Sequence, residues 1–249
     1  MKKGLAFVIT SIAISFSSHY ASADDHLVEV FSSSIFDASY KERRQALGFI
    51  FGVNYEQVIP SKYFSPIQNT KSYSELFGDV PMNGFRIHGG LKLNALIGSI
   101  IGGVEYGRSD IDGYSTTTGS TTKIFEALTI NKKGFFGRIQ LDAMTSEPII
   151  VPFVKAAYMT ADMTARSSSD TTVLSLDSTT EISAGIMLQL NWIEPESSRI
   201  AYISNGLENS FLEIFYLNIN HATPAVDEGK NKQDISSANS YGVGLVMEF

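Results

Sequence analysis

The stretch YGVGLVMEF, residues 241–249, carries the clearest fold signal in this chain. Successive side chains of a β-strand point to opposite faces, so alternate residues share a face. One face of this stretch carries Tyr241, Val243, Leu245, Met247 and Phe249. The other carries Gly242, Gly244 and Glu248, with Val246 as its one apolar side chain. This pattern favours a strand of a membrane β-barrel, in which one face is apolar and the other is small or polar. A strand of a soluble β-sandwich is the alternative.

The other end of the chain has the layout of a secretory signal peptide. Two lysines follow Met1, residues 4–16 are mostly apolar, and Ala21-Ser22-Ala23 offers small residues for cleavage. The apolar run is too short for a membrane anchor, because a spanning helix needs about 20 apolar residues. The sequence therefore predicts a cleaved signal peptide over 1–23, a periplasmic segment over 24–42, and a barrel over 43–249.

Composition narrows the class of protein. The chain has 249 residues, no cysteine and a formal net charge of −7, and its mean hydropathy is +0.03. Without cysteine it has neither disulfides nor thiol chemistry. Net acidity argues against nucleic acid as a partner, because phosphate binding requires clustered Lys and Arg. A mean hydropathy near zero is expected where apolar and polar residues alternate along every strand.

Segments in which apolar and polar residues alternate recur along the chain and predict eight strands. Apart from the C-terminal strand, the clearest of these segments ends at Trp192. Long polar loops are expected over 58–82, 109–133, 162–178 and 222–238. Shorter links are expected near 94–95, 146–148 and 193–209. Since the long loops all fall on one side of the sheet, an antiparallel up-and-down transmembrane barrel with long external loops and short periplasmic turns accounts for the order. If residues 124–130 were a separate membrane strand, the count would be ten.

The order of elements resembles the OmpA-type and opacity-type family of eight-stranded bacterial outer-membrane barrels, which includes many surface antigens. The segment PFVKAAY, residues 152–158, is similar to the fifth-strand motif of that family, and residues 241–249 are similar to its C-terminal strand. Lys155 and Ala157 depart from the motif, which has glycine or another small residue there. The resemblance covers about residues 43–249. It implies a monomer in the outer membrane, in contact with lipid, whose last strand is recognised by the barrel-assembly machinery.

No residue pattern predicts catalysis, a cofactor or a metal site. Once the signal peptide is removed, His26, His88 and His221 remain, and no two of them have metal-ligand spacing. The segment 110–113, Asp-Ile-Asp-Gly, lacks the later glutamate of a calcium loop and is expected to be a solvated turn. We therefore expect a protein that is not an enzyme.

Charged residues on the inner face are the remaining candidates for a site. The alternation places nine of them towards the lumen: Glu56, Arg86, Lys92, Glu105, Arg138, Asp142, Lys155, Glu181 and Glu248. An eight-stranded barrel is just wide enough to be filled by side chains, so these charges are expected to pair. For Arg138 the partner would be Glu105 or a carboxylate across the lumen. An ion pathway is the alternative.

These features predict a surface protein with a structural or adhesive role, whose external loops bind an external protein or a host ligand. Two alternatives remain from the sequence. One is a small channel or passive carrier for small or apolar solutes, and the other is a soluble secreted all-β protein.

Overall fold

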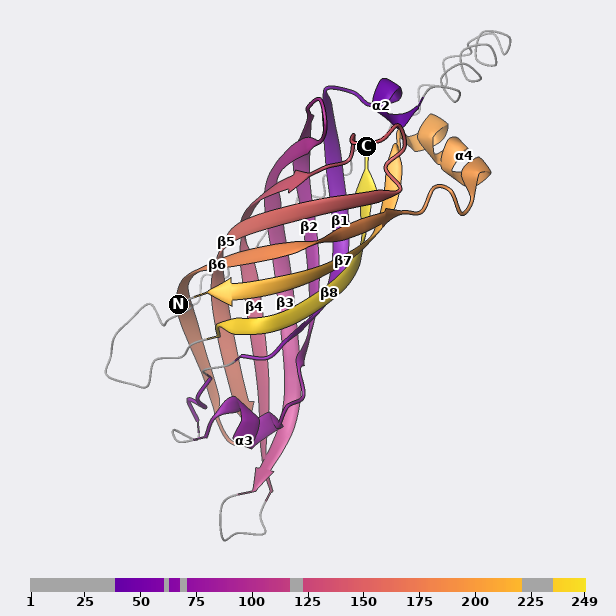
Figure 1. Cartoon of the computed structure of the whole chain (residues 1–249). Helices are drawn as coiled ribbons and strands as arrows, with labels where there is room; N and C mark the ends of the chain where they lie inside the picture. Colours follow the sequence, from indigo (N-terminus) through magenta and orange to yellow (C-terminus); the bar gives the residue numbers. More distant parts are fainter. Residues whose placement is uncertain (1–38, 61–62, 68–70, 117–122, 221–234) are drawn as a thin grey trace, which may run out of the picture. The chain divides into compact units, whose positions relative to one another are not determined.

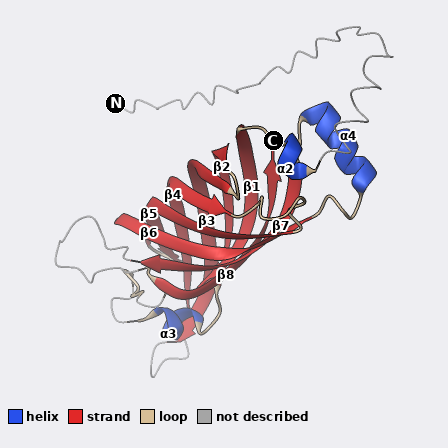
Figure 2. Ribbon diagram, turned by 45° about the horizontal axis from the view of Figure 1, so that its top comes forward, coloured by secondary structure: helices blue, strands red, loops and turns tan. Residues whose placement is uncertain are grey.

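The computed structural model describes residues 39–249 except 61–62, 68–70, 117–122 and 221–234. Residues 38–249 form one compact unit. Eight strands close into an antiparallel barrel in which each strand pairs with its neighbour in sequence and β1 pairs with β8 (Figures 1 and 2). The strands are β1 (Leu47–Val58), β2 (Met82–Asn94), β3 (Ser99–Thr116), β4 (Lys123–Gln140), β5 (Ile150–Ser167), β6 (Thr171–Gln189), β7 (Asn209–Asn220) and β8 (Ser237–Glu248).

The described residues also form three short helices in the segments that precede or connect the strands. Helix α2 (Tyr40–Arg43) precedes β1, α3 (Tyr73–Phe77) lies in the β1–β2 link, and α4 (Pro195–Asn205) lies in the β6–β7 link. We call the two ends of the barrel the α3 end and the α4 end, since these helices mark them in Figure 1. In the described part of the chain, no helix combines the length and the apolar character needed to cross a membrane. The predicted signal peptide, residues 1–23, and most of the predicted segment 24–42 lie outside the described residues.

The eight-strand prediction is confirmed, and the ten-strand alternative is wrong because residues 123–140 form one continuous strand. Two of the predicted long loops are also wrong. Strands β3 and β4 are separated by residues 117–122 alone, and β5 and β6 by 168–170 alone. Both hairpins continue past the apolar zone of the outer face, where outward side chains such as Arg108 and Asp162 are polar. The apolar–polar alternation that marks a membrane strand is therefore absent there. These threonine-rich residues still form strands, because threonine is common in β-strands.

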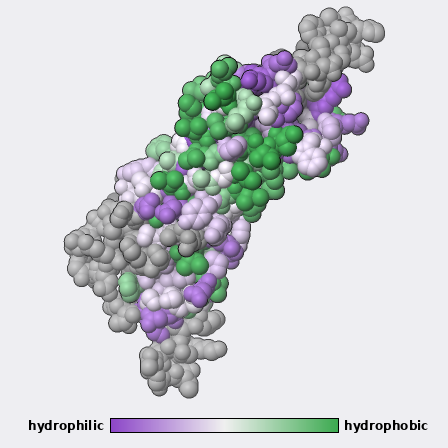
Figure 3. Space-filling model, viewed as in Figure 1, coloured by the Kyte–Doolittle hydropathy of each residue, from purple (hydrophilic) through white to green (hydrophobic). Residues whose placement is uncertain are grey.

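The outer face of the barrel carries a continuous apolar band. Exposed large hydrophobic side chains occur at alternate positions of every strand, and Figure 3 shows them gathered over the strands towards the α4 end. Within β1, β5 and the C-terminal segment, the apolar stretches are residues 47–55, 150–158 and 241–249. Each contains nine residues, close to the 9–11 that a tilted strand needs to cross a bilayer.

Exposed tyrosines mark the edge of this band on the α3 side. On β1, β3, β5, β7 and β8 the last outward position of the band is a tyrosine: Tyr55, Tyr106, Tyr158, Tyr216 and Tyr241. The next outward residue on β1, β3, β5 and β7 is polar. Tyrosine has an apolar ring and a polar hydroxyl, and rings of such residues flank the apolar band of membrane barrels.

Beyond the band, β3 to β6 continue as a four-stranded wall at the α3 end. Its inner face bears a buried apolar cluster that includes Leu128, Ile130 and Met163, covered by Tyr73 and Phe77 of α3. The β1–β2 link thus packs against the wall, and Tyr63 and Ser65 of that link donate hydrogen bonds of 2.9 Å to the buried carboxylate of Glu126 on β4. Burial, and then the charge of Glu126, raise the pKa of Tyr63 well above its ordinary value of 10.

Candidate functional site

The strand alternation directs charged side chains into the barrel. Of the nine predicted lumen residues, eight lie on strands and Asp142 lies in the β4–β5 link, and all nine are buried. Taking these charges out of water costs several kcal/mol each unless they are paired with good geometry. Their contacts fall into three groups along the lumen.

The central group surrounds Arg86 of β2. Its guanidinium donates to Glu56 of β1 and to both carboxylate oxygens of Glu181 of β6, and its Nη1 lies 3.4 Å from Glu105 of β3. Strands β2 and β6 are not neighbours, so the Arg86–Glu181 pair crosses the lumen. One guanidinium therefore joins β2 to three other strands through charge-assisted hydrogen bonds, which are stronger than neutral ones.

Two lysines complete the central group. Lys132 of β4 lies 2.5 Å from Glu56, and Lys155 of β5 lies 2.8 Å from Glu105. Each lysine is also 3.9 Å from an oxygen of Glu181. With Arg86, three cations face three carboxylates, so the central group has no formal net charge.

A second group crosses the lumen between β4 and β7. Arg138 lies 2.6 Å from Glu213, and its guanidinium carbon is 3.8 Å from the ring centroid of Phe153. Asn54 of β1 also donates to Glu213, at 3.4 Å. Arg138 therefore pairs with a carboxylate across the lumen, while Glu105 pairs with Lys155 and Arg86.

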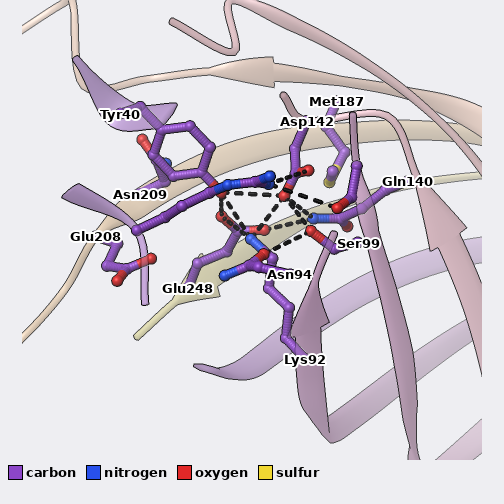
Figure 4. Close-up of polar contacts among 12 residues, drawn as sticks. Tyr40, Lys92, Asn94, Ser99, Gln140, Asp142, Met187, Glu208, Asn209 and Glu248 are labelled. Carbon is purple, nitrogen blue, oxygen red and sulfur yellow. Dashed lines mark hydrogen bonds and ion pairs between the residues drawn. The ribbon is translucent and has the colours of Figure 1, made fainter. Parts of the chain in front are cut away.

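The third group closes the α4 end (Figure 4). Lys92 of β2 is 2.7 Å from Asp142 and 2.8 Å from Glu248, and it donates to the Tyr40 hydroxyl at 2.7 Å. The Tyr40 hydroxyl lies 3.0 Å from Asp142 and 3.1 Å from Glu248, and Arg44 adds a second cation 3.2 Å from Asp142. Tyr40 of α2 therefore lies across the α4 end of the lumen.

The electrostatics of this third group follow from burial and charge. Burial, then the charges of Glu248 and Asp142, raise the pKa of Tyr40 far above its ordinary value of 10, so the hydroxyl remains a donor. Burial alone would raise the pKa of Asp142, but the nearby Lys92 and the hydrogen bonds from Lys92, Ser99 and Gln140 outweigh it and lower that pKa below 3.8.

Several residues of these groups are not among the nine predicted from the sequence. Lys132 falls in the predicted loop 109–133, but it is part of β4, in which side chains alternate between the inner and outer faces. Glu213 was missed because both faces of residues 211–221 are apolar enough to hide the register. Tyr40 lies in a segment without any period, so no pattern assigned it to the lumen.

The three histidines and the segment 110–113, from which the sequence predicts no metal site, lie as follows. His88 is buried in the lumen beside Phe136, with 5.6 Å between ring centroids, whereas His26 and His221 lie outside the described residues. The segment 110–113, predicted as a turn, is part of β3, where Asp110 pairs with Arg108 at 3.0 Å. In the described ranges, no three His, Cys, Asp or Glu side chains are grouped closely enough to hold a metal ion.

The C-terminal strand closes the barrel. Tyr241, Val243, Leu245 and Met247 pair with β1 on one side and with β7 on the other. Beyond the end of β8, the backbone of Phe249 exchanges two hydrogen bonds of 2.8 Å with Phe49, and the two rings lie 6.5 Å apart.

Comparison with known proteins gives likeness at the level of structure only. The chain matches no protein-family model and no curated protein. Among solved structures it is similar to Neisserial surface protein A, with 8% identity and a TM-score of 0.44, over 82% of this chain and 98% of that one. It is also similar to Ail, the attachment invasion locus protein of Yersinia pestis, in complex with the heparin analogue sucrose octasulfate (10% identity, TM-score 0.41, 82% and 97% covered). A third similar structure is the N-terminal β-barrel domain of Pseudomonas aeruginosa OprF (10% identity, TM-score 0.39, 82% and 98% covered).

Proposed function

We propose that this chain is an integral outer-membrane protein whose α3 end faces outside, and whose barrel supports a surface structure instead of conducting solutes. The apolar band with its tyrosine edge is the observation that carries the membrane assignment, because a soluble protein rarely exposes so large a continuous apolar surface. Strand β1 begins and strand β8 ends at the α4 end (Figure 1). We assign this end to the periplasm, so the α3 end is external.

The lumen supports a structural role over a channel. Six cations and six carboxylates belong to the three groups, and each takes part in at least one ion pair. Buried apolar side chains fill other parts of the interior, among them Phe136, Phe153 and Phe215. A channel would need a continuous path of water past these side chains, and an eight-stranded barrel has little room for one.

The external wall formed by β3 to β6 is the element that we assign to surface interaction. Its outward face is solvated and carries charged and hydroxyl side chains such as Arg108, Asp110 and Asp162. A rigid sheet presents these side chains at fixed positions, which suits recognition of an external protein or host ligand.

Trp192 provides a direct test of the membrane assignment. It is the only tryptophan of the chain, it lies in the link before α4, and its side chain is 65% exposed. On folding into lipid vesicles its emission is expected to shift to shorter wavelength and to be quenched by brominated lipid chains. Unchanged emission and recovery of the protein in the aqueous phase would refute the proposal.

A second experiment tests the closed lumen and the orientation. The purified protein in planar bilayers is expected to show no steady conductance, and protease added to intact cells is expected to cut at the α3 end only. Large, stable single-channel openings would favour the channel alternative. Cleavage in the α4 link of intact cells would reverse the orientation.

A further inference from the structure

A groove lies on the outer face of the barrel where β3, β4 and β5 run side by side. This open groove has a volume of about 410 Å³ and is lined mainly by the side chains of Val104, Phe135 and Tyr158, with Lys133 and Thr160 at one end. Glu105 and Gly134 complete the lining, but the Glu105 carboxylate is turned into the lumen and paired with Lys155. The groove is thus apolar along its length and cationic at one end.

The strand register fixes the groove at the edge of the apolar band. Val104, Phe135 and Tyr158 are cross-strand partners and form one outward row. The next row towards the α3 end is Tyr106, Lys133 and Thr160. The row after that consists of polar residues, Arg108, Asn131 and Asp162. Lys133 therefore stands at the level where the band gives way to water.

Lys133 is an available cation at this level. It is exposed, and it makes no ion pair with any described residue. The nearby Arg108 is held by Asp110, and Asp162 accepts a hydrogen bond from Ser175 at 3.1 Å. A lysine ammonium binds phosphate as a compact point charge, and its stem can lie along apolar surface while the charge reaches the headgroups. The Thr160 hydroxyl beside it donates a hydrogen bond of 3.4 Å to the backbone carbonyl of Lys133, so the ammonium is the group left to bind phosphate.

We propose that this groove binds a lipid of the leaflet at the α3 end, with an acyl chain along Val104, Phe135 and Tyr158 and a headgroup phosphate on Lys133. Charge complementarity favours this occupant, because a free anion would leave the apolar lining without a partner and an uncharged lipid would leave Lys133 without one. The inference rests on the proposed membrane function and adds a specific ligand class to it.

Native mass spectrometry of the purified, folded barrel tests the site with three probes. Dioleoyl phosphatidic acid carries both parts of the proposed ligand, dioleoylglycerol has the same chains without phosphate, and inorganic phosphate has no chains. Phosphatidic acid is expected to bind in a ratio of one per barrel, and at least about tenfold more tightly than dioleoylglycerol, as a charge-assisted contact implies.

Two variants locate the bound lipid. Lys133→Gln is expected to weaken phosphatidic acid about tenfold and to leave dioleoylglycerol unchanged. Val104→Trp fills the groove and is expected to weaken both lipids. The matched control is Arg166→Gln, which removes one exposed positive charge from the outward face of β5 beyond the band and is expected to change neither.

The outcomes separate this inference from the membrane assignment. Trp192 emission is measured first, and failure to insert refutes the proposed function itself. If the barrel inserts, equal binding of the two lipids, equal binding to Lys133→Gln and wild type, or competition by inorganic phosphate alone would each overturn the lipid site. Formation of a dimer that excludes phosphatidic acid would overturn it as well, since a second copy would then occupy the groove.

Discussion

Removing one member of the Arg138–Glu213 pair is expected to destabilise the barrel more than removing the charge of both. The two side chains are 1% and 2% exposed and lie 2.6 Å apart, so neither charge has water as a substitute partner. Breaking such a buried pair costs about 3–5 kcal/mol, because the remaining charge is left uncompensated. Arg138→Met should therefore lower the free energy of unfolding by about 3–5 kcal/mol.

The double variant Arg138→Met, Glu213→Gln removes both charges. The methionine would lie against Phe153 and Met187, and the glutamine oxygen would still accept the hydrogen bond from Asn54. Its cost is expected to be about 1–3 kcal/mol, the penalty for amide groups with incomplete partners. A net coupling of several kcal/mol between the two positions is then the signature of a buried pair.

Urea unfolding of the barrel in lipid vesicles measures these differences. Trp192 reports the transition, and it lies outside the lumen in the link before α4, so the substitutions do not change its surroundings. Should the double variant lose as much stability as the two single variants combined, the two charges would not be coupled. Should Arg138→Met lose less than about 1 kcal/mol, the site would have to be hydrated, contrary to the burial described above.

Three further results are expected. Ile186→Arg, which places a charge on the outer face within the apolar band, should lower the free energy of unfolding by about 2–4 kcal/mol, whereas Val173→Arg on the wall beyond the band should leave it almost unchanged. Equal losses for the two variants in vesicle unfolding would show that the position assigned to the band is wrong. The pKa of Asp142 in the folded state lies below its ordinary value of 3.8, so its contribution to stability is fully present above pH 3.8 and is lost as the pH falls through the folded-state pKa. The free energy of unfolding measured against pH should show this loss in the wild type and not in Asp142→Asn. Deletion of Phe249 removes the hydrogen bonds and the ring contact with Phe49, and should reduce heat-modifiable protein in the outer membrane while export continues; normal assembly would refute an assembly role for this residue.

The barrel was predictable because its signal is repeated. The thickness of the membrane requires a stretch of about nine residues with an apolar outer face, such as 241–249. Such stretches recur on other strands, whatever side chains those strands pack inside the barrel. The wall beyond the band was not predictable in the same way. There Thr129, Asp162 and Ser175 face water, so the outward positions have no reason to be apolar, and the sequence has the composition of a loop.

The inner positions were predictable as a set and not as pairs. Alternation assigns Arg86 and Glu181 to the inner face, but the pairing of strands that are not neighbours depends on the tilt and shear of the closed sheet. The bulge between β5 and β6 adds a further displacement, because it moves the inward positions of β6 from even numbers, as at Leu176, to odd numbers, as at Thr179. Period alone does not reveal where such a bulge falls.

The crossing ion pairs also constrain the order in which the barrel forms. Seven of the eight strand pairings join consecutive strands, so they can form locally, whereas β1 meets β8 only after every other strand is in place. Arg86–Glu181, Arg138–Glu213 and Lys132–Glu56 each join strands that are not neighbours. An open sheet in the bilayer would hold these charges apart in a medium where unpaired charges are costly. Curling of the sheet, sealing of its edges and neutralisation of its charges are therefore one cooperative event, and a half-formed barrel is not a stable intermediate in the membrane.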